Sequence, residues 1–286
     1  MSLSKVFPIG VMLDSFRLPL EQALEQACAV GAEGLQVYAI SGEMAPENCG
    51  ASQRQHFINR CAQLNLTIAA LCGDIGGFSD PQRNPAQISR SFKILELAAD
   101  LGCPVVTTHI GVIPEDHDHP RFKIYHEACE QLGRRAEALG VHFAVETGPE
   151  TAATLKSFLD SLDTRFVGVN YDPANLVMVT GDDPVKGVAV LKDYIVHTHA
   201  KDGRKLRESD PEVIYLGKPG DDPIITADQY FEELPLGQGE VDWPRYLAAL
   251  DAAGYHGFLT IEREVGNQPA KDIAEAVSFL KKAMTA

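Results

Sequence analysis

The sequence predicts an α/β protein built as one closed, parallel (β/α)8 barrel over residues 1–286. Strand-like apolar runs alternate with helical patterns about eight times, most connections are short, and polar residues close several of the later runs. Such an alternation with right-handed crossovers closes into a barrel with every helix outside. An open, doubly wound sheet is the competing architecture, but no GxGxxG motif opens the first helix.

The predicted elements follow one another along the whole chain. Runs rich in Val, Ile, Phe or Tyr mark the strands: VFPIGVML, GLQVYA, LTIAALC, VVTTH, VHFAVE, FVGVNYD, YIVHTH and HGFLTIE. The predicted helices begin after Pro19 and then span residues 52–64, 85–101, a segment through 129 to 139, 154–162, 185–191, 242–253 and 271–284. Glycines just past helical runs, such as Gly102 and Gly140, are typical of helix ends.

One connection is far longer than the others. Between His199 and Asp242 lie about forty residues where two to six are usual. We therefore predict a long loop insertion at about residues 200–241 that serves function or assembly. An insertion near a barrel mouth also favours a homodimer or homotetramer.

The bulk composition argues against several classes of protein. A formal net charge of −15 suits nucleic acid poorly, because binding phosphates requires clustered Lys and Arg. The six cysteines show no CxxC spacing, which favours reduced thiols in a cytoplasmic protein. No export signal is present and no apolar run reaches about 18 residues, so we expect no membrane association.

Four polar residues that close separate apolar runs form the main candidate site. They are Glu146, Asp172, His199 and Glu262. The carboxyl ends of all strands in a parallel barrel emerge on one face, so these side chains should converge there. Neighbouring carboxylates repel one another and lose hydration, which protons or a cation would relieve. Three carboxylates and an imidazole favour one divalent ion, Mn2+, Mg2+ or Co2+, with Zn2+ also compatible.

The segments around these residues resemble those of a known family. AVETG, NYDPANL, HTHAKDG, LGQGEVDW and GFLTIERE are similar to segments of the xylose-isomerase-like sugar isomerases and epimerases, a TIM-barrel family that shares its barrel with the class II apurinic endonucleases. The likeness spans nearly the whole chain. It implies that the four residues bind one metal and that Glu146 and Glu262 also act as acid and base on opposite faces of a sugar. It also implies a place near the substrate for His109, in the segment HIG.

The sequence departs from the family pattern at two places. Many sugar epimerases carry a histidine three residues after the aspartate, where this chain has Asn175, which forms hydrogen bonds but carries no proton at neutral pH. The apurinic endonucleases carry further His and Asp ligands for three zinc ions. Here the third strand ends in LCGD, and no DxH follows His199 at the expected place. The substrate stays open, and a three-metal cluster is disfavoured.

Further polar residues near the site have two readings each. His197 shares a strand face with His199 one layer deeper, which favours a core or supporting role. Lys201 could donate to a substrate oxygen or move a proton, or it could pair with an aspartate at the rim. Arg204, in a cation-rich stretch, could attract an anionic group of the ligand or lie in a solvated loop. We expect substrate contacts from His109, Asn175, Lys201 and Arg204.

The glycine-rich segment GDIGG, residues 73–77, also has two readings. Its backbone N–H groups could cradle an anion such as phosphate, but the segment lacks the lysine of a phosphate loop and otherwise reads as a turn.

These features together predict a metal-dependent sugar isomerase or epimerase acting on a small ketose or polyol-derived ketone. A carbon beside a carbonyl loses its proton readily only if the forming enediolate oxygen meets positive charge, which the metal would supply. The nearest alternative is a lyase of the inosose dehydratase type, in which the same base acts and a hydroxyl then leaves. An apurinic endonuclease-like hydrolase is a remote alternative, and a barrel that binds sugar without turnover is another.

Overall fold

The computed structural model describes residues 6–208, 210–217, 226 and 229–285. Eight parallel strands close into a barrel in the order β1-β10-β7-β6-β5-β4-β3-β2, which confirms the predicted fold class. The barrel strands are β1 (Ile9–Met12), β2 (Gly34–Tyr38), β3 (Thr67–Cys72), β4 (Val105–Thr108), β5 (His142–Glu146), β6 (Val167–Tyr171), β7 (Ile195–Ala200) and β10 (Leu259–Ile261). Nearly all strand residues are buried, as expected for a parallel sheet covered on both faces.

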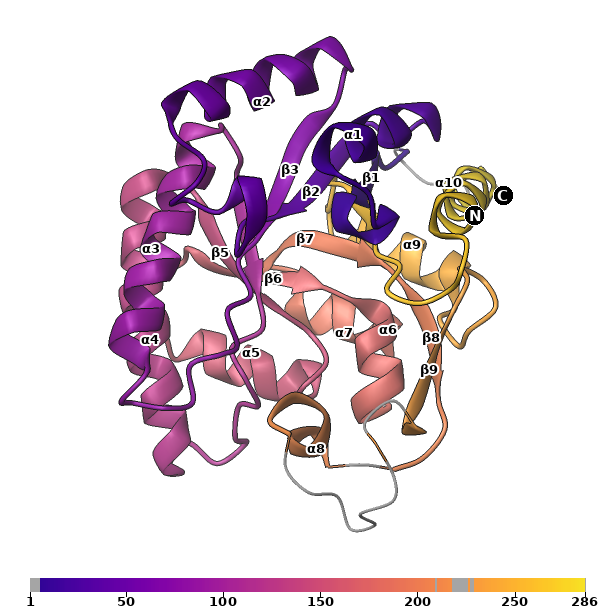
Figure 1. The fold of residues 1–286 in the computed structure, drawn as a ribbon. Coiled ribbons are helices and arrows are strands. Elements are labelled where there is room, and N and C mark those ends of the chain that lie inside the picture. The colour runs from indigo at the N-terminus through magenta and orange to yellow at the C-terminus, as the bar shows by residue number, and fades with distance from the viewer. Residues whose placement is uncertain (1–5, 209, 218–225, 227–228, 286) are drawn as a thin grey trace.

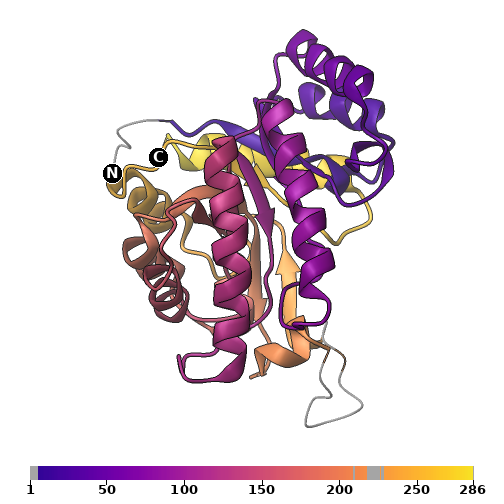
Figure 2. The ribbon, with the colours of Figure 1, turned by 90° about the vertical axis from the view of Figure 1, so that its left-hand side faces the viewer.

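Helices between the strands surround the barrel (Figure 1). They are α1 (Leu20–Ala29), α2 (Ala51–Gln63), α3 (Asn84–Asp100), α4 (Pro120–Leu139), α5 (Ala152–Asp160), α7 (Pro184–Leu191), α9 (Trp243–Ala252) and α10 (Pro269–Ala283). In α4, Pro120 stands in the first turn, where no hydrogen bond is lost, and Gly140 ends the helix at a φ of 68°. Figure 2 shows α3 and α4 lying side by side along one flank.

Short helical turns follow three of the strands. They are the 3-10 helices η1 (Leu13–Phe16) and η2 (Gly42–Met44), and α6 (Pro173–Asn175), which continues directly into the π-helix η3 (Leu176–Thr180). The turn after β6 was not predicted from the sequence. It places Asn175 over the end of β5, as described below.

The predicted insertion folds into structure of its own. Strands β8 (Asp202–Lys205) and β9 (Phe231–Leu234) form an antiparallel pair, and helix α8 (Pro211–Tyr215) lies between them in sequence. Residues 209, 218–225, 227 and 228 of the insertion lie outside the described part of the chain. Across the residues that are described, no helix combines the length and apolar character needed to cross a membrane.

Asp202 anchors the insertion to the barrel. Its carboxylate accepts the N–H groups of Gly203 at 2.9 Å, Gly237 at 2.8 Å and Val241 at 3.2 Å, and the indole Nε1–H of Trp243 at 2.9 Å. The carboxyl group is fully buried, so these four donors replace the water it lost. The two ends of the insertion are thereby fixed at one point.

Candidate functional site

Four barrel strands bring ligand-type side chains to one point. Glu146 ends β5, Asp172 follows β6, His199 lies in β7 and Glu262 follows β10. One oxygen or nitrogen atom from each residue lies within 4.8 Å of the others, and all four residues are buried. The structure thus brings together the whole ligand set expected from the sequence.

His199 Nδ1 lies at the centre of this group. It is 3.5 Å from Glu146 Oε1 and 3.4 Å from both Asp172 Oδ2 and Glu262 Oε2. Burial opposes a charged imidazole, but Glu262 and Glu146 outweigh it and raise the pKa of His199 well above its ordinary value. The space between the four side chains therefore stabilises a positively charged group.

Two buried atoms of the group lack hydrogen-bond partners, which bears on whether a metal ion fits between the four residues. Asp172 Oδ2 and His199 Nδ1 are buried without a hydrogen-bond partner. Buried polar atoms without partners are costly, and a cation between them would satisfy both. Three carboxylates and one imidazole are a ligand set that divalent ions accept. The residues present therefore fit the ion expected from the sequence.

Gln36, in β2, selects which nitrogen of His199 is free. Its amide Nε2 donates to Thr107 Oγ1 at 2.8 Å, and its Oε1 lies 3.0 Å from His199 Nε2 and 3.2 Å from His197 Nε2. An amide oxygen only accepts, so each Nε2 carries a proton, and Nδ1 is the His199 nitrogen that a cation would meet. Asn170 Nδ2 is also 3.2 Å from His199 Nε2, but it cannot donate to a protonated nitrogen and instead donates to Glu146 Oε2 at 3.1 Å.

His197 lies beneath the site, where the sequence predicted a core or supporting role. Burial first, and the neighbouring His199 second, lower the pKa of His197 to about 3. Its imidazole is therefore neutral and shares the Gln36 oxygen with His199.

Asn175 holds Glu146 from the other side. Its Nδ2 donates to Glu146 Oε1 at 2.9 Å. The turn that carries Asn175 is capped by Asp172, whose Oδ1 accepts the N–H groups of Ala174 at 2.8 Å and Asn175 at 2.9 Å. Asp172 thus caps the turn with one oxygen and presents the other to the candidate metal site.

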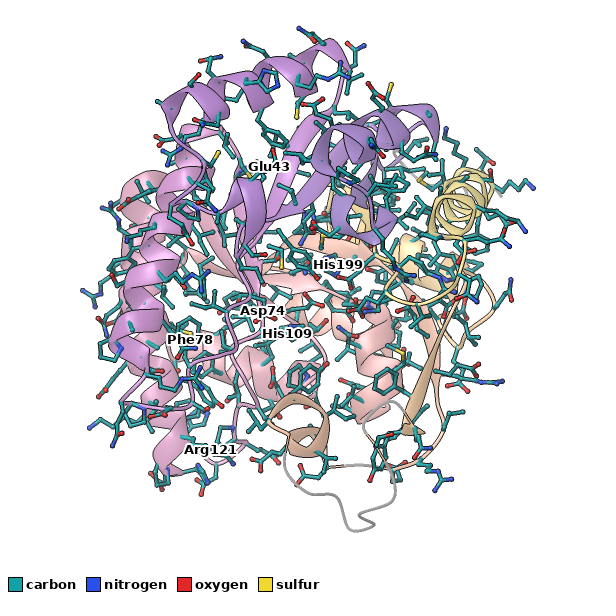
Figure 3. The ribbon with its side chains drawn as sticks, in the orientation of Figure 1. Glu43, Asp74, Phe78, His109, Arg121 and His199 are labelled. Carbon is teal, nitrogen blue, oxygen red and sulfur yellow. The ribbon has the colours of Figure 1, made fainter. Side chains whose placement is uncertain are left out.

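His109 lines the pocket above the four residues, and Asp74 supports it. The imidazole Nδ1 is 2.8 Å from Asp74 Oδ2, while Nε2 is 3.7 Å from Glu146 Oε1 and has no hydrogen-bond partner. Figure 3 shows Asp74 and His109 next to each other. Burial opposes protonation, but Glu146 and Asp74 raise the pKa of His109 to about 9. The sequence reasoning missed Asp74, although it follows an apolar run in LCGD as the ligands follow theirs.

Lys201 also lines the pocket but is paired with acidic side chains. Its Nζ is 3.0 Å from Glu262 Oε2 and contacts Glu264, and only 5% of the side chain is exposed. Burial favours a neutral Glu262, yet Lys201 and His199 together lower the pKa of that carboxyl well below its ordinary value. Lys201 therefore holds Glu262 in its ionised form.

The structure does not bring Arg204 to the pocket. It lies in β8 opposite Glu232 of β9, and its guanidinium pairs with that carboxylate at 2.6 Å. Half of the Arg204 side chain is exposed to solvent. The antiparallel pairing of the insertion directs Arg204 to this surface ion pair, and its contact with a substrate stays a prediction.

The insertion contributes to the wall of the pocket through Ile214 and Tyr215 of α8 and Phe231 of β9. The Tyr215 ring packs against His109 with 5.2 Å between ring centroids. At Gly148, a Cβ atom would lie 2.6 Å from the Tyr215 hydroxyl, so only glycine fits beneath this ring. Nothing in the local sequence marked Tyr215, because its place depends on how the insertion folds back.

Comparison with known proteins relates most of the chain to one family. A profile of the xylose isomerase-like TIM-barrel family matches residues 24–283. The inosose dehydratase of Lacticaseibacillus casei is 27% identical over 146 residues, which cover 50% of this chain and 46% of that protein. The inosose dehydratase of Geobacillus thermodenitrificans is 29% identical over 147 residues, which cover 48% of this chain and 45% of that protein. The chain thus spans about half the length of the curated relatives it matches.

Solved structures with low sequence identity share the fold. A xylose isomerase domain protein from Planctomyces limnophilus has a TM-score of 0.80 at 24% identity and 98% coverage of both chains. The 3-keto-D-glucoside 4-epimerase of E. coli has a TM-score of 0.72 at 16% sequence identity, and the match covers 96% of this chain and 99% of that one. A xylose isomerase-like barrel protein from Mycobacterium smegmatis in complex with magnesium has a TM-score of 0.72 at 19% sequence identity. That match covers 100% of this chain and 99% of the other. The profile match over most of its length shows that this chain belongs to the xylose isomerase-like TIM-barrel family.

Proposed function

We propose that the protein is a divalent-metal-dependent sugar isomerase or epimerase. Its substrate would be a small ketose or polyol-derived ketone, from which the enzyme moves a proton at the carbon beside the carbonyl. The observation that carries this proposal is the pair of buried carboxylates, Glu146 and Glu262, which approach the same His199 nitrogen at 3.5 and 3.4 Å. They come from opposite sides of β7, because Glu262 follows the adjacent strand β10 and Glu146 ends β5, two strands away on the other side. Both also line the open pocket, where a substrate would meet them.

Glu146, Asp172, His199 and Glu262 would hold one ion, with Mn2+, Mg2+ or Co2+ favoured and Zn2+ compatible. When bound, the ion supplies positive charge that stabilises negative charge developing on a substrate oxygen. One relative of known structure, at 19% identity, is a magnesium complex, which agrees with this choice.

The surrounding side chains orient the two carboxylates for proton transfer. Amide donors from Asn170 and Asn175 fix the two oxygens of Glu146, and Lys201 fixes Glu262. In an epimerisation one carboxylate accepts the proton from carbon, and the other carboxyl group returns a proton to the opposite face. In an isomerisation the proton returns to the neighbouring carbon. The free Nε2 of His109 faces the pocket and can hydrogen-bond a substrate oxygen.

Dehydration of an inosose-type ring ketone is the second candidate function. The matches to inosose dehydratases over half of the chain favour it. The pairing of His109 with Asp74 adds a specific observation, since a protonated His109 could donate to a departing hydroxyl. In this reaction a carboxylate removes the proton from carbon, the C–O bond of the neighbouring carbon breaks, and water leaves with the proton from His109.

One experiment separates these reactions. The Mn2+-loaded protein is incubated in D2O with a panel of ketoses and inososes, and the products are followed by NMR. Deuterium at the carbon beside the carbonyl with retention of all oxygens supports isomerisation or epimerisation, whereas loss of water with a new conjugated ketone supports the dehydratase. A panel without exchange or loss of water contradicts both. Three zinc ions per chain would instead favour a hydrolase of the apurinic endonuclease type.

A further inference from the structure

Negative charge dominates the wall of the pocket. Asp74, Glu146, Glu262 and Glu264 line it, and the buried Asp172 lies 3.4 Å from the lining residue His199. Among the lining residues that the structure describes, Lys201 is the one lysine or arginine, and its Nζ already contacts Glu262 and Glu264. Five carboxylates thus face Lys201, a divalent ion and His109, which leaves an excess of at least one negative charge whether or not His109 is protonated.

Four arginines around the barrel mouth already form hydrogen bonds or ion pairs with oxygen atoms of the chain itself. Arg17 donates to the carbonyls of Glu264 and Gly266 at 2.7 Å each. The carboxylate partners of the others are Glu212 for Arg121, Glu232 for Arg204 and Glu233 for Arg263. Arginine is the usual bidentate partner of a phosphate or carboxylate, and each of these four would have to give up a partner to serve one.

Backbone N–H groups that could bind an anion are also taken by the protein. At the start of α5, the N–H of Ala152 donates to Asp182 Oδ2 at 2.9 Å. The first turn of α8 donates to Asp210 through Glu212 N–H at 2.9 Å. In the glycine-rich segment 73–77, the Gly76 N–H donates to Asp74 Oδ1 at 3.1 Å. Carboxylates of the chain therefore already occupy these three N–H groups.

We infer that the pocket takes an uncharged polyhydroxy ketone and rejects the phosphorylated or carboxylated form of the same molecule. An anion would lose its hydration shell and face a wall of like charge, which costs binding free energy. Hydroxyl groups of a neutral sugar would instead donate to lone pairs that the Asp74 and Glu264 carboxylates keep beside their present partners. The reaction carried out on that ketone rests on the proposed function. The preference for an uncharged ligand depends only on the carboxylates that line the pocket.

Calorimetric titration of the Mg2+-loaded protein tests this selection without turnover. The probes are two matched pairs, D-fructose with D-fructose 6-phosphate and D-tagatose with D-tagatose 6-phosphate, together with inorganic phosphate. We expect the phosphorylated member to bind at least about tenfold more weakly than its parent. Inorganic phosphate should show no binding at about 1 mM. A phosphorylated ketose that binds as tightly as its parent, or phosphate that binds at this concentration, would overturn the inference.

Charge variants show whether the wall causes the selection. Glu264→Lys should improve phosphate binding at least about tenfold, and Glu264→Gln should give a smaller improvement in the same direction. The side chain of Glu264 is more than half exposed, so neither variant disturbs the core. Glu43→Gln, which removes an exposed carboxylate outside the pocket, is the matched control and should leave phosphate binding unchanged. Unchanged phosphate binding in both Glu264 variants would contradict the inference, whereas failure of the deuterium exchange experiment would leave these binding ratios intact.

Discussion

Gln36→Leu tests how the protein prepares His199 for a metal ion. Leucine is close to glutamine in size but accepts no hydrogen bond, so the Nε2–H groups of His197 and His199 both lose their acceptor at a fully buried position. Each unsatisfied buried donor costs about 1 to 3 kcal/mol, so the two donors together predict a loss of about 2 to 6 kcal/mol in the free energy of unfolding. Loss of a hydrogen bond that orients a metal-ligating histidine also weakens metal binding about 10- to 100-fold.

Two measurements check this prediction. Calorimetric titration with Mn2+ gives the affinity, and 1H–15N NMR of the imidazoles reports whether His199 still carries its proton on Nε2. Asn84→Leu is the matched control, because it removes a buried amide that donates to the Phe78 carbonyl at 2.9 Å. That control should lose stability and bind Mn2+ as the wild type does. A folded Gln36→Leu protein with wild-type Mn2+ affinity and an unchanged His199 tautomer would refute the reasoning.

Three further predictions concern catalysis and stability. Glu146→Gln and Glu262→Gln should each abolish deuterium exchange into the substrate and weaken Mn2+ binding, and wild-type exchange in both would remove the acid and base assignments. Burial raises the pKa of Glu150 from 4.5 to about 8, so the native chain keeps a proton that the unfolded chain has released, and native stability falls as the pH rises through this interval. Glu150→Gln should therefore gain stability over the wild type between about pH 5 and pH 9, by at most about 4 to 5 kcal/mol, and a pH-independent difference in urea unfolding would contradict this. Asp202→Ala removes the acceptor of four donors and should lower the free energy of unfolding in urea by about 2 to 4 kcal/mol. Asp242→Ala, which removes a helix cap, should lower it by about 1 kcal/mol. Equal losses in the two variants would contradict the anchoring role of Asp202.

The barrel and the meeting of the four candidate ligands could be predicted because both follow from local patterns. Eight apolar runs, each followed by a helical pattern, leave few arrangements other than a closed parallel barrel. A residue at the carboxyl end of a barrel strand has a fixed destination, whatever the helices do. Glu146, Asp172, His199 and Glu262 stand at or just past the ends of such strands, so their meeting point follows from the fold class.

The supporting residues could not be predicted in the same way, because their roles depend on contacts between strands. Gln36 is a single polar residue within the apolar run GLQVYA, and only the closed barrel brings it to two histidines of β7. A polar side chain within a buried strand is a usable signal, since it requires buried partners. The ion pair of Arg204 with Glu232 could not be predicted, because the sequence did not reveal that the insertion pairs β8 with β9. The same pairing determines where Tyr215 lies.

The central claim is that one divalent ion binds where β5, β6, β7 and β10 end. Anomalous diffraction from a crystal soaked in Mn2+ tests it most directly. The account predicts one manganese peak per chain, coordinated by Glu146, Asp172, His199 Nδ1 and Glu262. A site without manganese after soaking, or a peak coordinated by other residues, would contradict it.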